Sequence, residues 1–95
     1  MGKLRRLVLD ILKPHEPNII EFAEQISESE GISAVNISIF EVDREVENAK
    51  ITVEGDAIAY SQVFDLIREL GGTIHSIDEV VAGKKIIEYA ETLQD

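Results

Sequence analysis

The sequence of 95 residues carries 19 acidic and 9 basic residues, for a net charge of −10, and 44% of its residues are hydrophobic. These values predict one globular domain and exclude a nucleic-acid interface, which needs clustered Lys and Arg. No apolar run approaches the roughly 20 residues of a membrane-spanning helix, and the absence of cysteine excludes disulfides and thiolate metal sites. We therefore expect a cytoplasmic protein without membrane contact.

The first third of the chain predicts a strand followed by a helix. Residues 4–12 alternate between one apolar face and one half-polar face, as a strand does. Prolines within residues 13–17 end this strand, because a central strand does not accommodate them. Asn18 is a candidate N-cap. Apolar residues at helical spacing then continue to about Glu30, after which Gly31 supplies a left-handed stop.

A strand, a turn and a returning strand are predicted between Gly31 and Asp56. Val35, Ile37 and Ile39 alternate with polar residues, and the same alternation returns after the turn. If the segment stays extended, acidic side chains at every second position project from one side of the hairpin tip. These acidic residues are Glu41, Asp43, Glu45 and Glu47.

The remainder of the chain predicts a helix and a fourth strand. Asp56 is a candidate N-cap for a helix whose apolar stripe reaches Leu70, where a Gly-Gly pair ends it. Residues 73–81 predict a strand with apolar residues in both phases, and a bulge near Asp78 would explain this change of phase. Residues 84–95 suit either a helix or a strand, and we expect an extended tail.

This order of elements, βαββαβ, predicts a ferredoxin-like α+β fold for residues 1–83, followed by a C-terminal extension, residues 84–95. Right-handed crossovers place the first and third strands in the middle of one antiparallel sheet and both helices on one face. The second and fourth strands are then the edges. Apolar side chains are also expected on the face that no helix covers, and these are Val8, Leu12, Phe40 and Val42.

Exposed apolar groups of this size, together with free sheet edges, predict self-association into a homo-oligomer. We expect the C-terminal extension, residues 84–95, to take part in this assembly. The alternative is that the extension folds back and covers the uncovered sheet face of its own chain.

Four segments of the chain resemble a known family of small archaeal proteins, grouped as domain of unknown function 211 (DUF211). The resemblance covers essentially the whole chain and implies a ferredoxin-like fold and ring-like homo-oligomers. It implies no activity, because the family has none established. The segments that carry it are 12–17 (Leu-Lys-Pro-His-Glu-Pro), 35–37, 41–48 and the long block 71–83.

The predicted topology brings several polar residues to one end of the sheet. The first strand ends there at His15 and Glu16, and the fourth strand begins there with His75. Imidazole and carboxylate can bind a transition metal; the alternative is that both histidines are structural. The hairpin acids on the same rim are candidates for a hard cation such as Ca²⁺ or Mg²⁺. The alternatives are a solvated tip, or neutralisation by Arg44, Lys50 or a neighbouring subunit.

The sequence contains no nucleophile-and-base pattern and no phosphate-binding loop. We therefore expect a non-enzymatic, homo-oligomeric binding or regulatory module that binds a divalent cation or a small ligand at subunit boundaries. The competing hypothesis is a metal-dependent enzyme that uses His15, Glu16 and His75.

Overall fold

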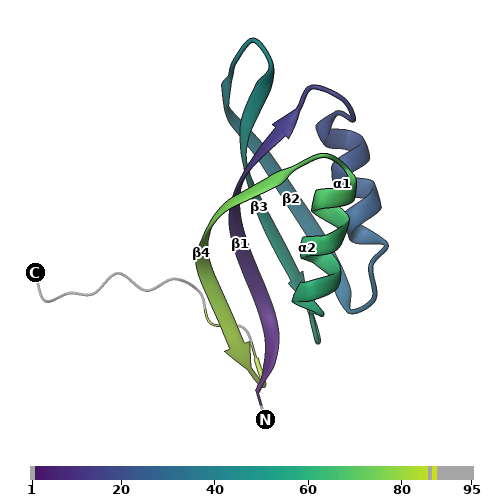
Figure 1. Cartoon of the computed structure of the whole chain (residues 1–95). Helices are drawn as coiled ribbons and strands as arrows, with labels where there is room; N and C mark the ends of the chain where they lie inside the picture. Colours follow the sequence, from purple (N-terminus) through teal and green to yellow (C-terminus); the bar gives the residue numbers. More distant parts are fainter. Residues whose placement is uncertain (1, 86, 88–95) are drawn as a thin grey trace, which may run out of the picture.

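The structure is a computed structural model and describes residues 2–85 and 87 (Figure 1). Its four strands form one sheet in the order β2-β3-β1-β4, in which neighbouring strands run antiparallel. Both helices lie on one side of this sheet. The predicted ferredoxin-like α+β fold is confirmed, with β1 and β3 in the middle and β2 and β4 at the edges. The elements in chain order are β1 (Lys3–Pro14), α1 (Ile19–Ser27), β2 (Ile32–Val42), β3 (Val46–Gly55), α2 (Tyr60–Glu69) and β4 (Thr73–Gly83).

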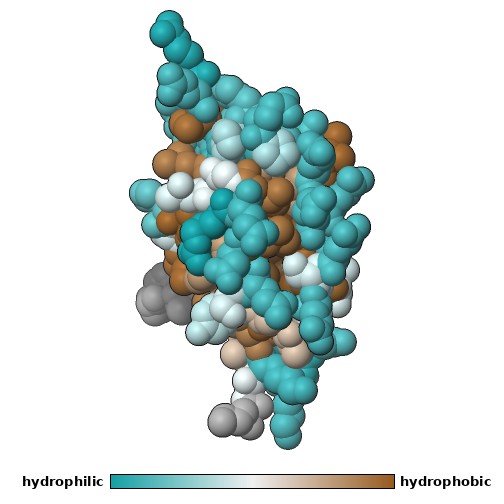
Figure 2. All heavy atoms as spheres, turned by 45° about the vertical axis from the view of Figure 1, so that its right-hand side comes forward, coloured by the Kyte–Doolittle hydropathy of each residue, from teal (hydrophilic) through white to brown (hydrophobic). Residues whose placement is uncertain are grey.

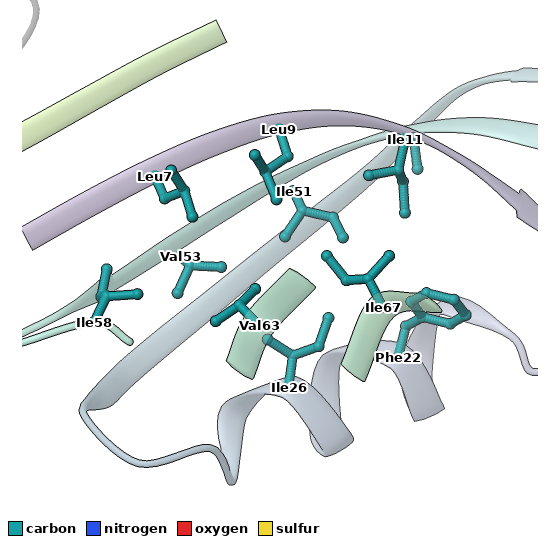
Figure 3. Close-up of a cluster of buried hydrophobic side chains, with 11 residues drawn as sticks. Leu7, Leu9, Ile11, Phe22, Ile26, Ile51, Val53, Ile58, Val63 and Ile67 are labelled. Carbon is teal, nitrogen blue, oxygen red and sulfur yellow. The ribbon is translucent and has the colours of Figure 1, made fainter. Parts of the chain in front are cut away.

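The hydrophobic core lies between the sheet and the helices (Figure 3). Leu7, Leu9 and Ile11 alternate along β1 and are buried, and α1 contributes Phe22 and Ile26. Each fully buried side chain of this kind contributes about 1.5–3 kcal/mol of transfer free energy. The period-2 pattern of β1 therefore decides which side of the sheet the helices cover. The remaining buried core residues are Ala49, Ile51, Val53, Ile58, Val63 and Ile67.

The two helix starts differ in how well the sequence predicts them. The Asn18 side chain accepts a hydrogen bond at 3.0 Å from the N–H three residues on, as predicted for an N-cap. Helix α2 begins at Tyr60, so Asp56 is not its N-cap. The reason is Ile58, which is buried and donates its N–H to the carbonyl of Leu4 at 2.9 Å. This contact holds the segment before α2 in a non-helical conformation against β1, so the helix begins only at Tyr60.

Two glycines allow close backbone packing where β2 begins and β3 ends. Helix α1 ends at Ser27, earlier than expected, and Gly31 has a φ of 84°. A Cβ atom at Gly31 would collide with the carbonyl oxygen of Ala57, and one at Gly55 would collide with the carbonyl oxygen of Gly31. Only glycine permits backbones to approach so closely.

Strand β4 is irregular. The bulge predicted near Asp78 is confirmed by a shift in its register with β1, and a second shift occurs at His75. Because of these shifts, Ile74, Ile77 and Val80 pair with β1 residues that face the core, whereas Val81 pairs with Arg6. These three isoleucine and valine side chains therefore share the helix side of the sheet.

The sheet face without helices is more polar than predicted. Val8 is only 8% exposed, whereas Phe40 is 56% exposed. A register shift near the end of β2 places Val42 opposite Glu47, which pairs in turn with the buried Lys13. Directly paired residues share a face, so Val42 belongs to the helix side and its predicted position was wrong. Cross-strand rows on the uncovered face are polar, as in Ser38–Lys50–Asp10–Ser76.

The predicted C-terminal extension lies outside the described residues except for Lys84, Lys85 and Ile87. Within the part of the chain that the structure describes, no helix has the length and apolar character needed to cross a membrane.

Candidate functional site

A lysine is buried where β1 ends. The side chain of Lys13 has no exposed surface. Its ammonium lies 5.1 Å from the ring centroid of Phe22, a cation–π distance. It donates hydrogen bonds to the carbonyl oxygen of Pro14 at 2.6 Å and to Oε1 of Glu47 at 2.9 Å. An ammonium removed from water requires such partners, so the carboxylate of Glu47 on β3 neutralises a charge at the edge of the core.

The same carboxylate also contacts a histidine. Oε2 of Glu47 lies 2.8 Å from Nδ1 of His15, and Nε2 of His15 lies 2.8 Å from the carbonyl oxygen of Arg44. Carbonyl and carboxylate oxygens only accept hydrogen bonds, so both contacts are satisfied together when both ring nitrogens carry protons. We call Lys13, Glu47, His15 and the Arg44 carbonyl the tip network, because they tie β1 to the hairpin between β2 and β3.

The tip network shifts two pKa values in opposite directions. Hydrogen bonds to Glu47 and to the Arg44 carbonyl raise the pKa of His15 above 6.5. Hydrogen bonds from His15 and Lys13 lower the pKa of Glu47 below 4.5. By linkage, the contribution of His15 is complete below pH 6.5 and is lost as pH rises through its raised pKa, whereas that of Glu47 is complete above pH 4.5 and is lost as pH falls through its lowered pKa. The network is therefore strongest between these two values.

We expect the His15→Gln variant to be destabilised most near pH 5.5 and less near pH 8.5. As pH rises through the raised pKa of His15, the wild-type imidazole gives up a proton and satisfies only one of its two contacts. Denaturant unfolding of both proteins at both pH values measures the difference. A difference that is constant with pH, or that grows toward alkaline pH, would contradict the imidazolium assignment.

The hairpin acids do not project together. The register shift places Glu41 opposite Asn48, on the uncovered sheet face, and leaves Glu47 on the helix side. Asp43 and Glu45 lie in the turn between β2 and β3. The expectation that all four acidic side chains project from one side of the hairpin tip was wrong, because one extra residue in β2 changes the phase before the turn.

The two histidines contact different carboxylates. His15 is held by Glu47, whereas His75 is 69% exposed and places Nδ1 3.8 Å from Oδ2 of Asp10. Across residues 2–85 and 87, no group of three or more His, Cys, Asp or Glu side chains is arranged to hold a metal ion. One described chain thus does not assemble the predicted set of His15, Glu16 and His75. Metal binding by the hairpin acids stays a prediction.

That prediction has a simple test. If the hairpin acids bind a cation, millimolar Ca²⁺ or Mg²⁺ should raise the melting temperature more than NaCl does at equal ionic strength, whereas screening of surface charge alone would give an equal rise. A cation that binds the folded state would add an increment that depends on its own concentration. We expect this increment to disappear in the Asp43→Asn variant, and equal effects of divalent and monovalent salts on the wild type would contradict a cation site at the tip.

Sequence reasoning missed an ion-pair network on the uncovered sheet face. Arg6 is 8% exposed, and it donates to Glu54 on β3 at 2.7 Å and to Glu79 on β4 at 3.1 Å. Lys50 on β3 reaches across β1 to Asp78 on β4 at 3.2 Å. The available signal was the position of Arg6 in a central strand, but its partners depend on the register of three strands. These pairs fasten β3, β1 and β4 together.

An apolar surface remains uncovered on the helix side of β4. Ile77 is 52% and Val80 54% exposed, although both pair with core-facing residues of β1. We call these two side chains the β4 ledge. Figure 2, with the helix side turned forward, shows apolar surface between the polar side chains of this side. The ledge lies on an edge strand.

Comparison with known proteins places the chain in a family. The model of the family DUF211, described as an uncharacterized ArCR, matches residues 5–95. The chain belongs to this family. An uncharacterized protein of Methanocaldococcus jannaschii is 54% identical over 95 residues, covering 100% of this chain and 98% of the relative. DUF211 carries no described activity, so a function for the chain has to be argued from its residues.

Proposed function

We propose that this DUF211 protein is a non-catalytic, self-assembling module whose copies associate through β4. The observation that carries the proposal is the exposure of the β4 ledge, where Ile77 and Val80 are each more than half accessible. Exposed apolar side chains beside an unpaired strand edge are the usual mark of an association surface.

The two edges of the sheet differ in a way that supports β4. On β2, the helix-side residues Val35, Ile37 and Ile39 pack against the core and are partly buried. On β4, the equivalent residues Ile77 and Val80 extend beyond the helices and stay exposed. Phe40 and Val42 of β2 are also exposed, at 56% and 62%, but they lie at the hairpin end of that strand, beyond its register shift. Beside the helices, a partner therefore has more apolar surface to cover along β4 than along β2.

The state of the titratable side chains supports a non-catalytic role. The Glu47 carboxylate pairs with the Lys13 ammonium and with the His15 ring. These contacts suit a structural link between β1 and β3. A depression of about 410 Å³ on the uncovered face is lined by small and polar residues of β2 and β3. Its carboxylate, Glu54, is already paired with Arg6. The alternative, a metal-dependent enzyme using His15, Glu16 and His75, would need a neighbouring copy to bring the ligands together.

Light scattering over a range of micromolar concentrations tests the proposal. We expect a molar mass that is a multiple of the 10.6 kDa chain mass. A mass that stays at 10.6 kDa across the range would overturn the proposal. Elemental analysis of the same tag-free protein addresses the alternative, which requires a stoichiometric transition metal.

A further inference from the structure

The β4 ledge is small for a complete interface. Stable interfaces bury roughly 1,200–2,000 Å² in total, and Ile77 and Val80 account for only part of such an area. An edge strand offers more, because its unpaired N–H and C=O groups can bind another extended segment along their whole length. The partner that fits β4 is therefore an extended peptide with apolar side chains on one side.

We propose that this partner is the C-terminal extension of a second copy, residues 86–95, docked as an added strand along β4 with its apolar side chains on the β4 ledge. This inference rests on the proposed function and names the segment that would carry it. The occupant is a part of the same protein, and its chemistry can be read from the sequence.

The length of the extension matches the strand that would receive it. Residues 86–95 would span about 33 Å at roughly 3.3 Å per residue. The 11 residues of β4 span about 36 Å on the same scale. The extension begins just beyond Gly83, where β4 ends, so a copy packed beside β4 has its own extension within reach of the shared edge.

The side-chain pattern of the extension also matches. In an extended segment, residues two apart point to the same side. This places Ile87, Tyr89 and Leu93 together, with the acidic Glu91 between the last two. Ile87 is 63% exposed, so an apolar side chain at the start of the extension lacks cover in a single chain. Docking on the β4 ledge would bury apolar groups of both partners.

The residues that join β4 to the extension bear on the choice between a neighbouring β4 and the strand's own. The shortest return onto the same strand would use a two-residue turn, with positive φ at both central residues or at the first alone. Among residues 2–85 and 87, positive φ occurs only at glycines, and Gly83, with a φ of 135°, meets the second requirement. A return onto the strand's own edge is therefore the outcome that the crosslinking test has to separate. The exposed lysine pair, Lys84 and Lys85, precedes the docking segment, where it would meet the acidic surface of a neighbour that carries a net charge of −10.

Cysteine crosslinking tests the proposal, because the natural chain has no cysteine. The Val80→Cys and Tyr89→Cys variants are mixed and oxidised, and products are separated without reductant. We expect disulfide-linked dimers that contain one copy of each variant. The matched control pairs Tyr89→Cys with Ile20→Cys, since Ile20 is also strongly exposed, at 64%, but lies on α1.

Several outcomes would overturn the inference. One is equal crosslinking with the Ile20→Cys control, and another is a Val80→Cys/Tyr89→Cys double variant that links only within one chain. A third is a chain ending at Lys85 that is folded by circular dichroism and keeps the wild-type assembly mass. In that third case the proposed self-assembly stands and only the docking segment is wrong. A wild-type chain that is monomeric would overturn both the proposed self-assembly and the docking segment.

Discussion

Replacing Glu47 with alanine is expected to destabilise the folded chain by about 3 kcal/mol, because it leaves the Lys13 ammonium buried without its counter-ion. Lys13 has no exposed surface and Glu47 is 14% exposed, so neither charge is well hydrated. The carbonyl of Pro14 and the ring of Phe22 remain near the ammonium but carry no opposite charge. Denaturant unfolding at neutral pH measures the loss.

A double-mutant cycle separates the pair from simple truncation. Lys13→Met keeps the apolar stem against Phe22 and removes the charge, so it should cost less than Glu47→Ala. With Lys13→Met in place, Glu47→Ala should cost only a small fraction of its effect in the wild type. Additive effects of the two substitutions would show that the ion pair does not couple β1 to β3.

The second large effect concerns assembly. Placing lysines on the β4 ledge, as Ile77→Lys/Val80→Lys, is expected to convert the assembled protein into a monomer at micromolar concentration. Docking would then bury unpaired ammonium groups at several kcal/mol each, and every 1.4 kcal/mol weakens association about tenfold. Both side chains are more than half exposed, so the fold itself should tolerate the change. Sedimentation measures the mass, and circular dichroism confirms the fold.

The control variant is Ile20→Lys, which adds a charge at an equally exposed isoleucine of α1. We expect it to keep the wild-type mass. Loss of assembly in Ile20→Lys as well would point to a general effect of charge. An unchanged mass in Ile77→Lys/Val80→Lys would remove β4 from the interface.

The fold was predictable from local patterns in the sequence. The alternation in β1, the helical spacing after Asn18 and the paired strands around the hairpin each follow from period and capping chemistry. The bulge at Asp78 was visible as a change of apolar phase. Boundaries set by tertiary contacts were not predictable. Asp56 looked like an N-cap, but the burial of Ile58 moved the start of α2.

The candidate site was less predictable, because it depends on register. One extra residue near the end of β2 separates the hairpin acids and moves Val42 to the helix side. The approach of Lys13, Glu47 and His15 also follows from register, since Glu47 stands opposite Lys13 in the β1–β3 pair. Sequence reasoning placed His15 and the hairpin at one end of the sheet but did not identify the lysine as their link. Periodicity gives the face of a residue, and register gives its partner.

Amide hydrogen exchange along β4 tests the central claim most directly. In an isolated edge strand, N–H groups that point away from the neighbouring strand exchange quickly, whereas strand addition protects them. For the assembled wild-type protein we predict slow exchange of the outward amides of β4, compared with fast exchange of those of the other edge, β2. The Ile77→Lys/Val80→Lys variant should lose the protection of β4 while its inner strands keep theirs. Outward β4 amides that exchange as fast in the wild type as in this variant would contradict association through β4.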